Sequence, residues 1–294
     1  TLFPYTTLFR SVYHYLIRVA TGNADERKRA FAHRMVRNIT EIWKVKDVEE
    51  LENKMVDVIS TLRNSYDGEK LPPPIQRLKG MIREFEEELV WAYFGMTHKE
   101  VHHLRLGFYT GDIFTEKPDR KRDVEPILDQ LRRIKPGIIS LAFDPEGSGP
   151  DTHYKVLQAI AEAVRVWSRE TDLEHLRIWG YRNVWYKFHP AEVSHIVPVS
   201  LNAMGVMDNA FTNSYLSQVD ASFPSYQHDG KFSDLSNRIW GEQLYPIQLL
   251  LGKRFFYQNE SPRLRTTHGL LFFHEMNVEE FLASARELEK SMEG

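Results

Sequence analysis

A single histidine stands where a strand is followed by a helix. The segment Ile138 to Phe143 (IISLAF) is a continuous apolar run, typical of a strand that is buried on both faces. Asp144 follows it directly, and His153 comes after a loop that contains Gly147 and Gly149. The helical positions that share a face with His153, by steps of four, three and four, are Leu157, Ile160 and Val164. The sequence therefore predicts an imidazole at the carboxyl edge of a sheet, where open α/β proteins bind ligands.

Two interpretations of His153 stay open on spacing alone: a metal ligand, or a hydrogen-bonded structural residue. Asp151 or Thr152 can cap its helix. A catalytic zinc generally takes three protein ligands, and no second histidine or carboxylate lies three or four residues further along this helix. His102-His103 are adjacent on a predicted strand, so their rings point to opposite faces. Further ligands would have to come from elsewhere in the fold, or from sequence that is absent.

Three other groups of side chains could contact a ligand. Arg83 and Glu86 lie one turn apart on a predicted helix, either as substrate contacts or as an exposed ion pair. An aromatic-rich segment after a strand could be a platform for a sugar, or could serve packing; it holds Trp179, Tyr181, Arg182, Trp185 and Tyr186. A polar loop precedes a helix that it is expected to cap, and its residues are Tyr226, His228 and Asp229.

The elements that position these residues alternate between strand and helix. The predicted strands are 12–20, 101–106, 138–143, 177–181, 196–199 and 268–273. The predicted helices are 25–44, 47–63, 75–94, 123–134, 152–169, 202–218, 232–251 and 278–292. This order predicts a Rossmann-like α/β fold, with a mostly parallel sheet that carries helices on both faces.

Composition excludes several classes of protein. The 294 residues are 42% hydrophobic and 27% charged, which is typical of a globular chain and excludes collagen, coiled coil and bulk disorder. The formal charge of -3 provides no basic field for nucleic acid, and no apolar run is long enough for a membrane span. The absence of cysteine fits a reducing, cytoplasmic compartment and leaves His, Asp and Glu as the strong metal ligands. No G-x-G-x-x-G follows a strand, which disfavours nucleotide binding.

Several segments together resemble a known family. They are Arg83-Glu84-Phe85-Glu86, Tyr93-Phe94-Gly95, His102 to Leu106, Ile134-Lys135-Pro136, Pro150-Asp151-Thr152-His153-Tyr154-Lys155-Val156 and Leu216-Ser217-Gln218. In this order they resemble the PIG-L/LmbE-type N-acetylglucosaminyl deacetylases, and most closely the variant fused behind a glucosamine-6-phosphate deaminase domain. The resemblance covers Val12 to the C-terminus.

The resemblance implies a zinc-dependent amide hydrolase. In the family, zinc is held by a His and an Asp of an early AHPDD-type loop and by a His of a later HPDH-type element, which His153 matches. No His-Pro-Asp occurs in this sequence, and Pro150-Asp151-Thr152 replaces it before His153. Asp151 could take the orienting catalytic role, and Arg83 and Glu86 are the implied substrate contacts.

The resemblance also implies that the chain begins within a longer protein. Thr1 to Ser11 resembles a translated sequencing adapter, so we expect residues 12–294 to form the domain, without its first strand and first metal-ligand loop. The expected function is that of a zinc-dependent deacetylase fragment of amino-sugar metabolism, inactive by itself. The alternative is a non-catalytic sugar-binding or regulatory domain attached to a sugar-phosphate deaminase. The expected partner is an amino sugar or sugar phosphate, and homo-oligomerisation is left open.

Overall fold

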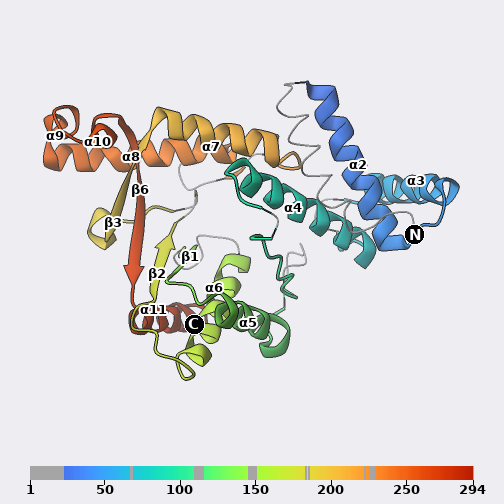
Figure 1. Cartoon of the computed structure of the whole chain (residues 1–294), viewed down its shortest axis with the longest axis horizontal. Helices are drawn as coiled ribbons and strands as arrows, with labels where there is room; N and C mark the ends of the chain where they lie inside the picture. Colours follow the sequence, from blue (N-terminus) through green and yellow to red (C-terminus); the bar gives the residue numbers. More distant parts are fainter. Residues whose placement is uncertain are drawn as a thin grey trace. The chain divides into compact units, whose positions relative to one another are not determined.

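The chain forms two compact units. The computed structural model describes residues 23–66, 69–97, 99–108, 116–144, 151–182, 184, 186–221, 223–224 and 229–293 (Figure 1). Unit 1 comprises the described residues within Thr1–His103 and Asn209–Val219. Unit 2 comprises those within Leu104–Tyr109, Thr115–Asp208 and Asp220–Gly294. The predicted strand 12–20 lies outside the described residues.

Unit 1 is helical in its described part. It contains α2 (Ala24–Trp43), α3 (Val48–Asn64), α4 (Pro73–Tyr93) and the end of α7 (Leu201–Ser214). The side chain of Asn23 caps α2 by accepting from the backbone of Asp25 at 2.9 Å, and Asp47 caps α3 through Glu50 at 2.8 Å. Apolar side chains of the three helices pack together, among them Ile39, Val58, Ile75 and Leu78. The helices predicted at 25–44, 47–63 and 75–94 are confirmed.

Unit 2 carries the sheet and the remaining elements. Its helices are the π-helical turn η1 (Arg120–Val124), α5 (Glu125–Ile134), α6 (Asp151–Trp167), the 3-10 turn η2 (Pro190–Glu192), the start of α7, α8 (Phe232–Leu251), α9 (Lys253–Tyr257), α10 (Pro262–Arg265) and α11 (Val278–Glu293). Its strands are β1 (Ile138–Ala142), β2 (Arg177–Tyr181), β3 (His195–Ser200), β4 (Phe223–Pro224), β5 (Asp229–Gly230) and β6 (Thr267–Met276). The helices predicted in this part are confirmed, except that α7 ends four residues before its predicted end.

The fold is mixed α/β, and its four-stranded sheet is mixed as well. The strand order is β1-β2-β6-β3, with β1 parallel to β2 and β6 antiparallel to both of its neighbours. The sequence predicted a mostly parallel sheet because strands and helices alternate. Alternating strands and helices predict parallel strands only where the helix between two strands carries the chain back to the edge at which the first strand began. Helix α6 does this between β1 and β2. The long connection through α8, α9 and α10 instead brings β6 back in the opposite direction.

The core of unit 2 explains the position of α6. Helices α5, α6 and α11 lie side by side, and α8 packs against β6 (Figure 1). Leu157 and Val164 of α6 are 1% and 0% exposed, in one cluster with Ile178 of β2 and Phe281 of α11. The inward stripe predicted for α6 is therefore confirmed, and it places His153 on the same side at the start of the helix.

The strand predicted at 101–106 is absent from the structure. These residues are described without regular structure, and Arg105 has a φ of 52°, in the left-handed region that extended strands do not use. The apolar residues that suggested a strand, Val101, Leu104 and Leu106, do not keep the backbone extended at Arg105.

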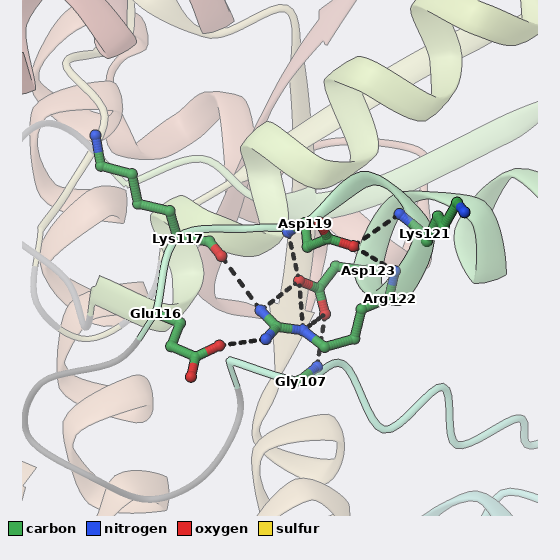
Figure 2. A network of polar contacts seen from close by, with 7 residues as sticks. All are labelled: Gly107, Glu116, Lys117, Asp119, Lys121, Arg122 and Asp123. Atoms are coloured by element: carbon green, nitrogen blue, oxygen red, sulfur yellow. Dashed lines mark hydrogen bonds and ion pairs between the residues drawn. The ribbon is translucent and has the colours of Figure 1, made fainter.

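A buried carboxylate anchors the segment that follows. The Asp123 carboxylate is fully buried and accepts from the backbone N–H of Gly107 at 2.6 Å and of Asp119 at 2.7 Å (Figure 2). Nη2 of Arg122 donates to it at 2.9 Å, and the same guanidinium also binds Glu116 and the Lys117 carbonyl. A Cβ on Gly107 would stand 2.0 Å from Nε of Arg122, so a larger residue here would have to displace the Arg122 side chain.

The described helices give no membrane span. No helix among the described residues is both long and apolar enough to cross a bilayer.

Candidate functional site

The carboxyl ends of β1 and β2 bring three polar side chains to one edge of the sheet. The two strands run parallel, with Ala142 opposite Tyr181. Asp144 follows β1 and Arg182 follows β2, so both leave the sheet at the same end. His153 begins α6, the helix that connects the two strands. Because parallel strands direct the following residues toward one rim, this edge is where an α/β sheet gathers functional groups.

His153 and Asp144 form a close pair at this rim. Nδ1 of His153 lies 2.9 Å from Oδ2 of Asp144, and the two side chains are 27% and 5% exposed. A carboxylate accepts the proton of Nδ1, which fixes the ring orientation and makes Nε2 the nitrogen with the lone pair. The predicted placement of His153 beside the end of the strand is confirmed by this contact.

Asp151 pairs with a lysine of its own helix. Its Oδ2 lies 2.5 Å from Nζ of Lys155, one helical turn along α6. The Lys155 side chain is 9% exposed and that of Asp151 is 48% exposed. The carboxylate that contacts the ring of His153 is that of Asp144, which the sequence placed directly after the strand.

Arg182 contributes a partly buried cation to the same edge. Its Nε donates to the Phe143 carbonyl at 3.3 Å, its Nη1 donates to the Lys187 carbonyl at 3.0 Å, and the guanidinium stacks 4.1 Å above the Phe188 ring. Burial lowers the pKa of Arg182, and the carboxylates of Glu192 and Asp144 oppose that effect. From the sequence, Arg182 stood out only as part of an aromatic segment.

A histidine missed by the sequence analysis lies beside this edge. His274 of β6 is paired with Gly180 of β2, and its ring stacks on that of Phe143 at 6.5 Å between centroids. Its Nδ1 lies 2.6 Å from the Glu192 carbonyl oxygen. The predicted strand ended at Phe273, whereas β6 continues to Met276, and the apolar residue at 276 was the available signal.

Arg83 and Glu86 belong to unit 1, where they form a second polar cluster. The Glu86 side chain is fully buried and accepts from the backbone N–H of Ser217 at 2.7 Å and from its hydroxyl at 2.8 Å. Nη1 of Arg83 lies 3.7 Å from Glu86, and its guanidinium is 5.9 Å from the centre of the Tyr215 ring. Two of the sequence segments behind the family resemblance therefore contact each other. The Arg83 side chain is 44% exposed, whereas that of Glu86 is fully buried.

Burial dominates the protonation of this cluster. It raises the pKa of Glu86, while the hydrogen bonds from Ser217 and the charge of Arg83 act in the opposite direction. Burial likewise raises the pKa of Tyr215, whose hydroxyl donates to Glu87 at 2.5 Å. A carboxyl with a raised pKa and a cation beside it could hold a polar ligand, or could stabilise unit 1 alone.

Ser217→Ala is expected to destabilise unit 1 by about 1–2 kcal/mol at pH 7, because a hydrogen bond to a charged, buried acceptor is lost. Since the hydroxyl favours the ionised form of Glu86, the loss should shrink as pH falls and Glu86 becomes protonated. Urea unfolding of both proteins at pH 7 and near pH 4 measures the difference.

Ser168→Ala is the matched control, since this exposed hydroxyl donates only to the nearby Arg165 carbonyl at 3.0 Å. Equal losses for the two variants, or a Ser217→Ala loss that does not depend on pH, would show that Glu86 does not need the hydroxyl.

The other residues singled out in the sequence have packing or ion-pair contacts. Nε2 of His103 lies 3.6 Å from Oε1 of Glu88. Trp179 donates from Nε1 to Glu275 at 2.6 Å and packs against Phe273 at 5.5 Å between ring centres. Asp229 pairs with Pro224 in the short β4–β5 ladder, and α8 begins after Lys231 without a side-chain cap. Trp185, Tyr226 and His228 lie outside the described residues.

Metal-ligating side chains do not cluster within the described part of the chain. There, no group of three or more histidines and carboxylates lies close enough together to hold an ion. His153 with Asp144 is thus a two-residue arrangement as far as the structure describes it.

Comparison with known proteins gives one distant relationship. No protein-family model and no solved structure matches the chain. A curated protein of Bacteroides thetaiotaomicron, with the name "Putative glucosamine-6-phosphate deaminase-like protein", is 27% identical over 210 residues. The alignment covers 70% of this chain and 31% of that protein, so the chain spans about a third of the length of the curated relative.

Proposed function

We propose that this chain is part of an amino-sugar-metabolising protein, in which His153 and Asp144 serve the hydrolysis of an N-acetyl amino sugar. The observation that carries the proposal is the 2.9 Å contact between His153 Nδ1 and Asp144 Oδ2 at the carboxyl edge of β1. The name of the distant relative supports the substrate class, because glucosamine 6-phosphate is an amino-sugar phosphate.

The His153–Asp144 pair fits one ligand position of a zinc site. Histidines that bind metals commonly donate their other ring N–H to a carboxylate, and here Asp144 accepts from Nδ1. When bound, zinc would supply a water that is deprotonated near neutral pH. His153 would hold it through Nε2, with further ligands from residues outside the described part of the chain.

The residues of this chain have separate tasks in the proposal. Asp144 keeps the imidazole of His153 in one tautomer and orientation. Arg182, 12% exposed at the same edge, supplies positive potential beside Asp144. Arg83 is the proposed polar contact to substrate in unit 1, and the buried Glu86 holds its guanidinium in place. Asp151, with its carboxylate on Lys155, is a proposed supporting acid at the start of α6.

The proposal also includes a specific fold class. The β1–α6–β2 unit, with its parallel strands and connecting helix, supports a Rossmann-like domain of the PIG-L/LmbE type. In this proposal residues 12–294 belong to that domain, and the parent protein carries a sugar-phosphate deaminase domain.

One observation favours a non-catalytic alternative. The Asp151 carboxylate, in the element that departs from the family pattern, is bound to Lys155 at 2.5 Å and is not the carboxylate on His153. A sugar-binding or regulatory domain would tolerate that arrangement, because it needs no orienting acid at this position.

Acetate release tests the proposal. The natural protein that contains this sequence is incubated with N-acetylglucosamine and with its 6-phosphate, with and without a chelator. We expect acetate from at least one substrate, its loss with the chelator and its return on addition of zinc. The 294-residue chain, in a parallel arm, should release none. Substrate binding without acetate release would favour the non-catalytic sugar-binding domain. Acetate release that is unchanged by the chelator would reject the metal-dependent mechanism.

A further inference from the structure

The last two turns of α8 expose large apolar side chains to solvent. Residues 244–251 (LYPIQLLL) hold no charged residue and a single amide, Gln248. Leu244 and Ile247 pack in one core cluster with Phe272 of β6. The other large side chains of this segment are 52–76% exposed, and they are Tyr245, Leu249, Leu250 and Leu251. A helix segment that is apolar on all sides is normally buried on all sides, so this one needs a partner outside the described part of unit 2.

Helix α9 extends this surface and adds positive charge. Helices α9 and α10 lie at the end of α8 (Figure 1). Phe256 of α9 is buried in the same core cluster as Leu244, whereas Phe255 and Tyr257 are exposed. Three exposed cations of α9 and α10 have no ion pair within the part of the chain that the structure describes, and they are Lys253, Arg254 and Arg263. We call the exposed side chains of Tyr245–Tyr257, together with Arg263, the basic corner.

Helix α3 of unit 1 carries an apolar stripe with the opposite charge. Its inward side chains belong to the core of unit 1, and they are Leu51, Met55 and Val58. A second face starts at Val48 and continues by steps of four, four and three residues through Glu52, Val56 and Ile59. The three apolar side chains of this face are 44–68% exposed. Glu52 and the adjacent Glu49 form no ion pair with any described residue. We call Val48, Glu49, Glu52, Val56 and Ile59 the acidic stripe.

Charge decides which of these surfaces can meet. Two basic corners in contact would bring uncompensated cations together, and two acidic stripes would do the same with carboxylates, so neither surface suits a copy of itself. A basic corner against an acidic stripe instead pairs opposite charges around two apolar surfaces. Each surface therefore has the partner that it needs on another copy of the same chain.

We propose that the acidic stripe of one copy of this chain docks on the basic corner of a second copy. This contact joins two different surfaces, so every bound copy keeps one surface free, and the assembly grows into a ring or an open chain of copies. Half-exposed side chains of this size offer about 100 Å² each, so the contact would bury roughly 1,000 Å², at the lower end for specific interfaces. We therefore expect a dissociation constant on the order of 10 μM. The inference does not rest on the proposed function.

Sedimentation velocity on the 294-residue chain, from about 1 to about 100 μM, measures the association. Species larger than the monomer should increase with concentration. Leu250→Asp in the corner and Val56→Asp in the stripe should each reduce this association at least about tenfold, because each places a carboxylate in the apolar contact. Ile134→Asp is the matched control, since Ile134 is an equally exposed apolar residue at the end of α5 and outside both surfaces, and it should associate like the unaltered chain.

A mixture of the two variants is the decisive sample. Leu250→Asp keeps its acidic stripe and Val56→Asp keeps its basic corner, so the mixture should form a dimer with one copy of each and nothing larger. That dimer would also show that both variants are folded. The proposal is overturned if either variant associates as the unaltered chain does, or if the mixture stays monomeric. A monomeric unaltered chain would also overturn it, and binding of that chain to phosphatidylglycerol vesicles would then assign the basic corner to a membrane surface.

Discussion

His153→Ala is expected to lower acetate release by the natural protein more than about 100-fold, beyond the about 10- to 100-fold typical of residues that only support a metal ligand. The reason is that Nε2 of His153 is the proposed ligand atom, and alanine offers none. Asp144→Asn should fall in the intermediate range, since the amide still contacts Nδ1 but no longer enforces one tautomer.

His175→Ala is the matched control for this series, because His175 is an exposed histidine of the same unit in the turn before β2. Its activity should equal that of the unaltered protein. Thermal melts of all three variants separate loss of chemistry from loss of folding. If His153→Ala were as active as His175→Ala, the rim of β1 would not be the site of hydrolysis.

Asp123→Ala is expected to lower the free energy of unfolding by about 3 kcal/mol, because it removes the fully buried carboxylate that two backbone N–H groups and Arg122 use as their acceptor. Arg122 itself is 36% exposed, and water can take over part of its charge, so the cost stays at the lower end for a buried pair. Asp129→Ala, which removes a 71% exposed partner of Arg132, should cost less than about 0.5 kcal/mol.

The pH dependence of this network has a definite sign. Burial by itself would raise the pKa of Asp123, but the hydrogen bonds from Arg122, Asp119 and Gly107 outweigh it and hold the pKa below its ordinary value. A lowered folded-state pKa contributes stability above the unfolded-state value and loses it as pH falls through the folded-state value. Chemical unfolding at pH 7 and near pH 3 should therefore show the Asp123→Ala loss shrinking in acid, and a constant loss would contradict the assignment.

Local periodicity was sufficient for most elements and for the placement of His153. The stripe through Leu157 and Val164 and the apolar run at 138–143 follow from backbone geometry that neighbouring residues determine. The direction of β6 and the absence of a strand at 101–106 could not be predicted in this way, because they depend on a long connection and on one left-handed residue, Arg105.

The partners within the site were harder to predict than its position. Asp144 and Asp151 are both carboxylates near His153 in sequence, and their spacing does not decide which one reaches the ring. The contact between Glu86 and Ser217 joins residues 131 positions apart and has no local signal. Arg182 and His274 reach the same edge from two further strands, through pairings that the sequence does not specify.

The zinc content of the natural protein tests the central claim most directly. Protein with His153 and protein carrying His153→Ala are purified side by side, and the bound zinc per chain is measured by elemental analysis. We expect bound zinc in the first and its loss in the second, with His175→Ala unchanged, because His153 is a proposed ligand. Equal zinc in the His153→Ala and unaltered proteins would contradict the claim that the His153–Asp144 pair holds the catalytic ion.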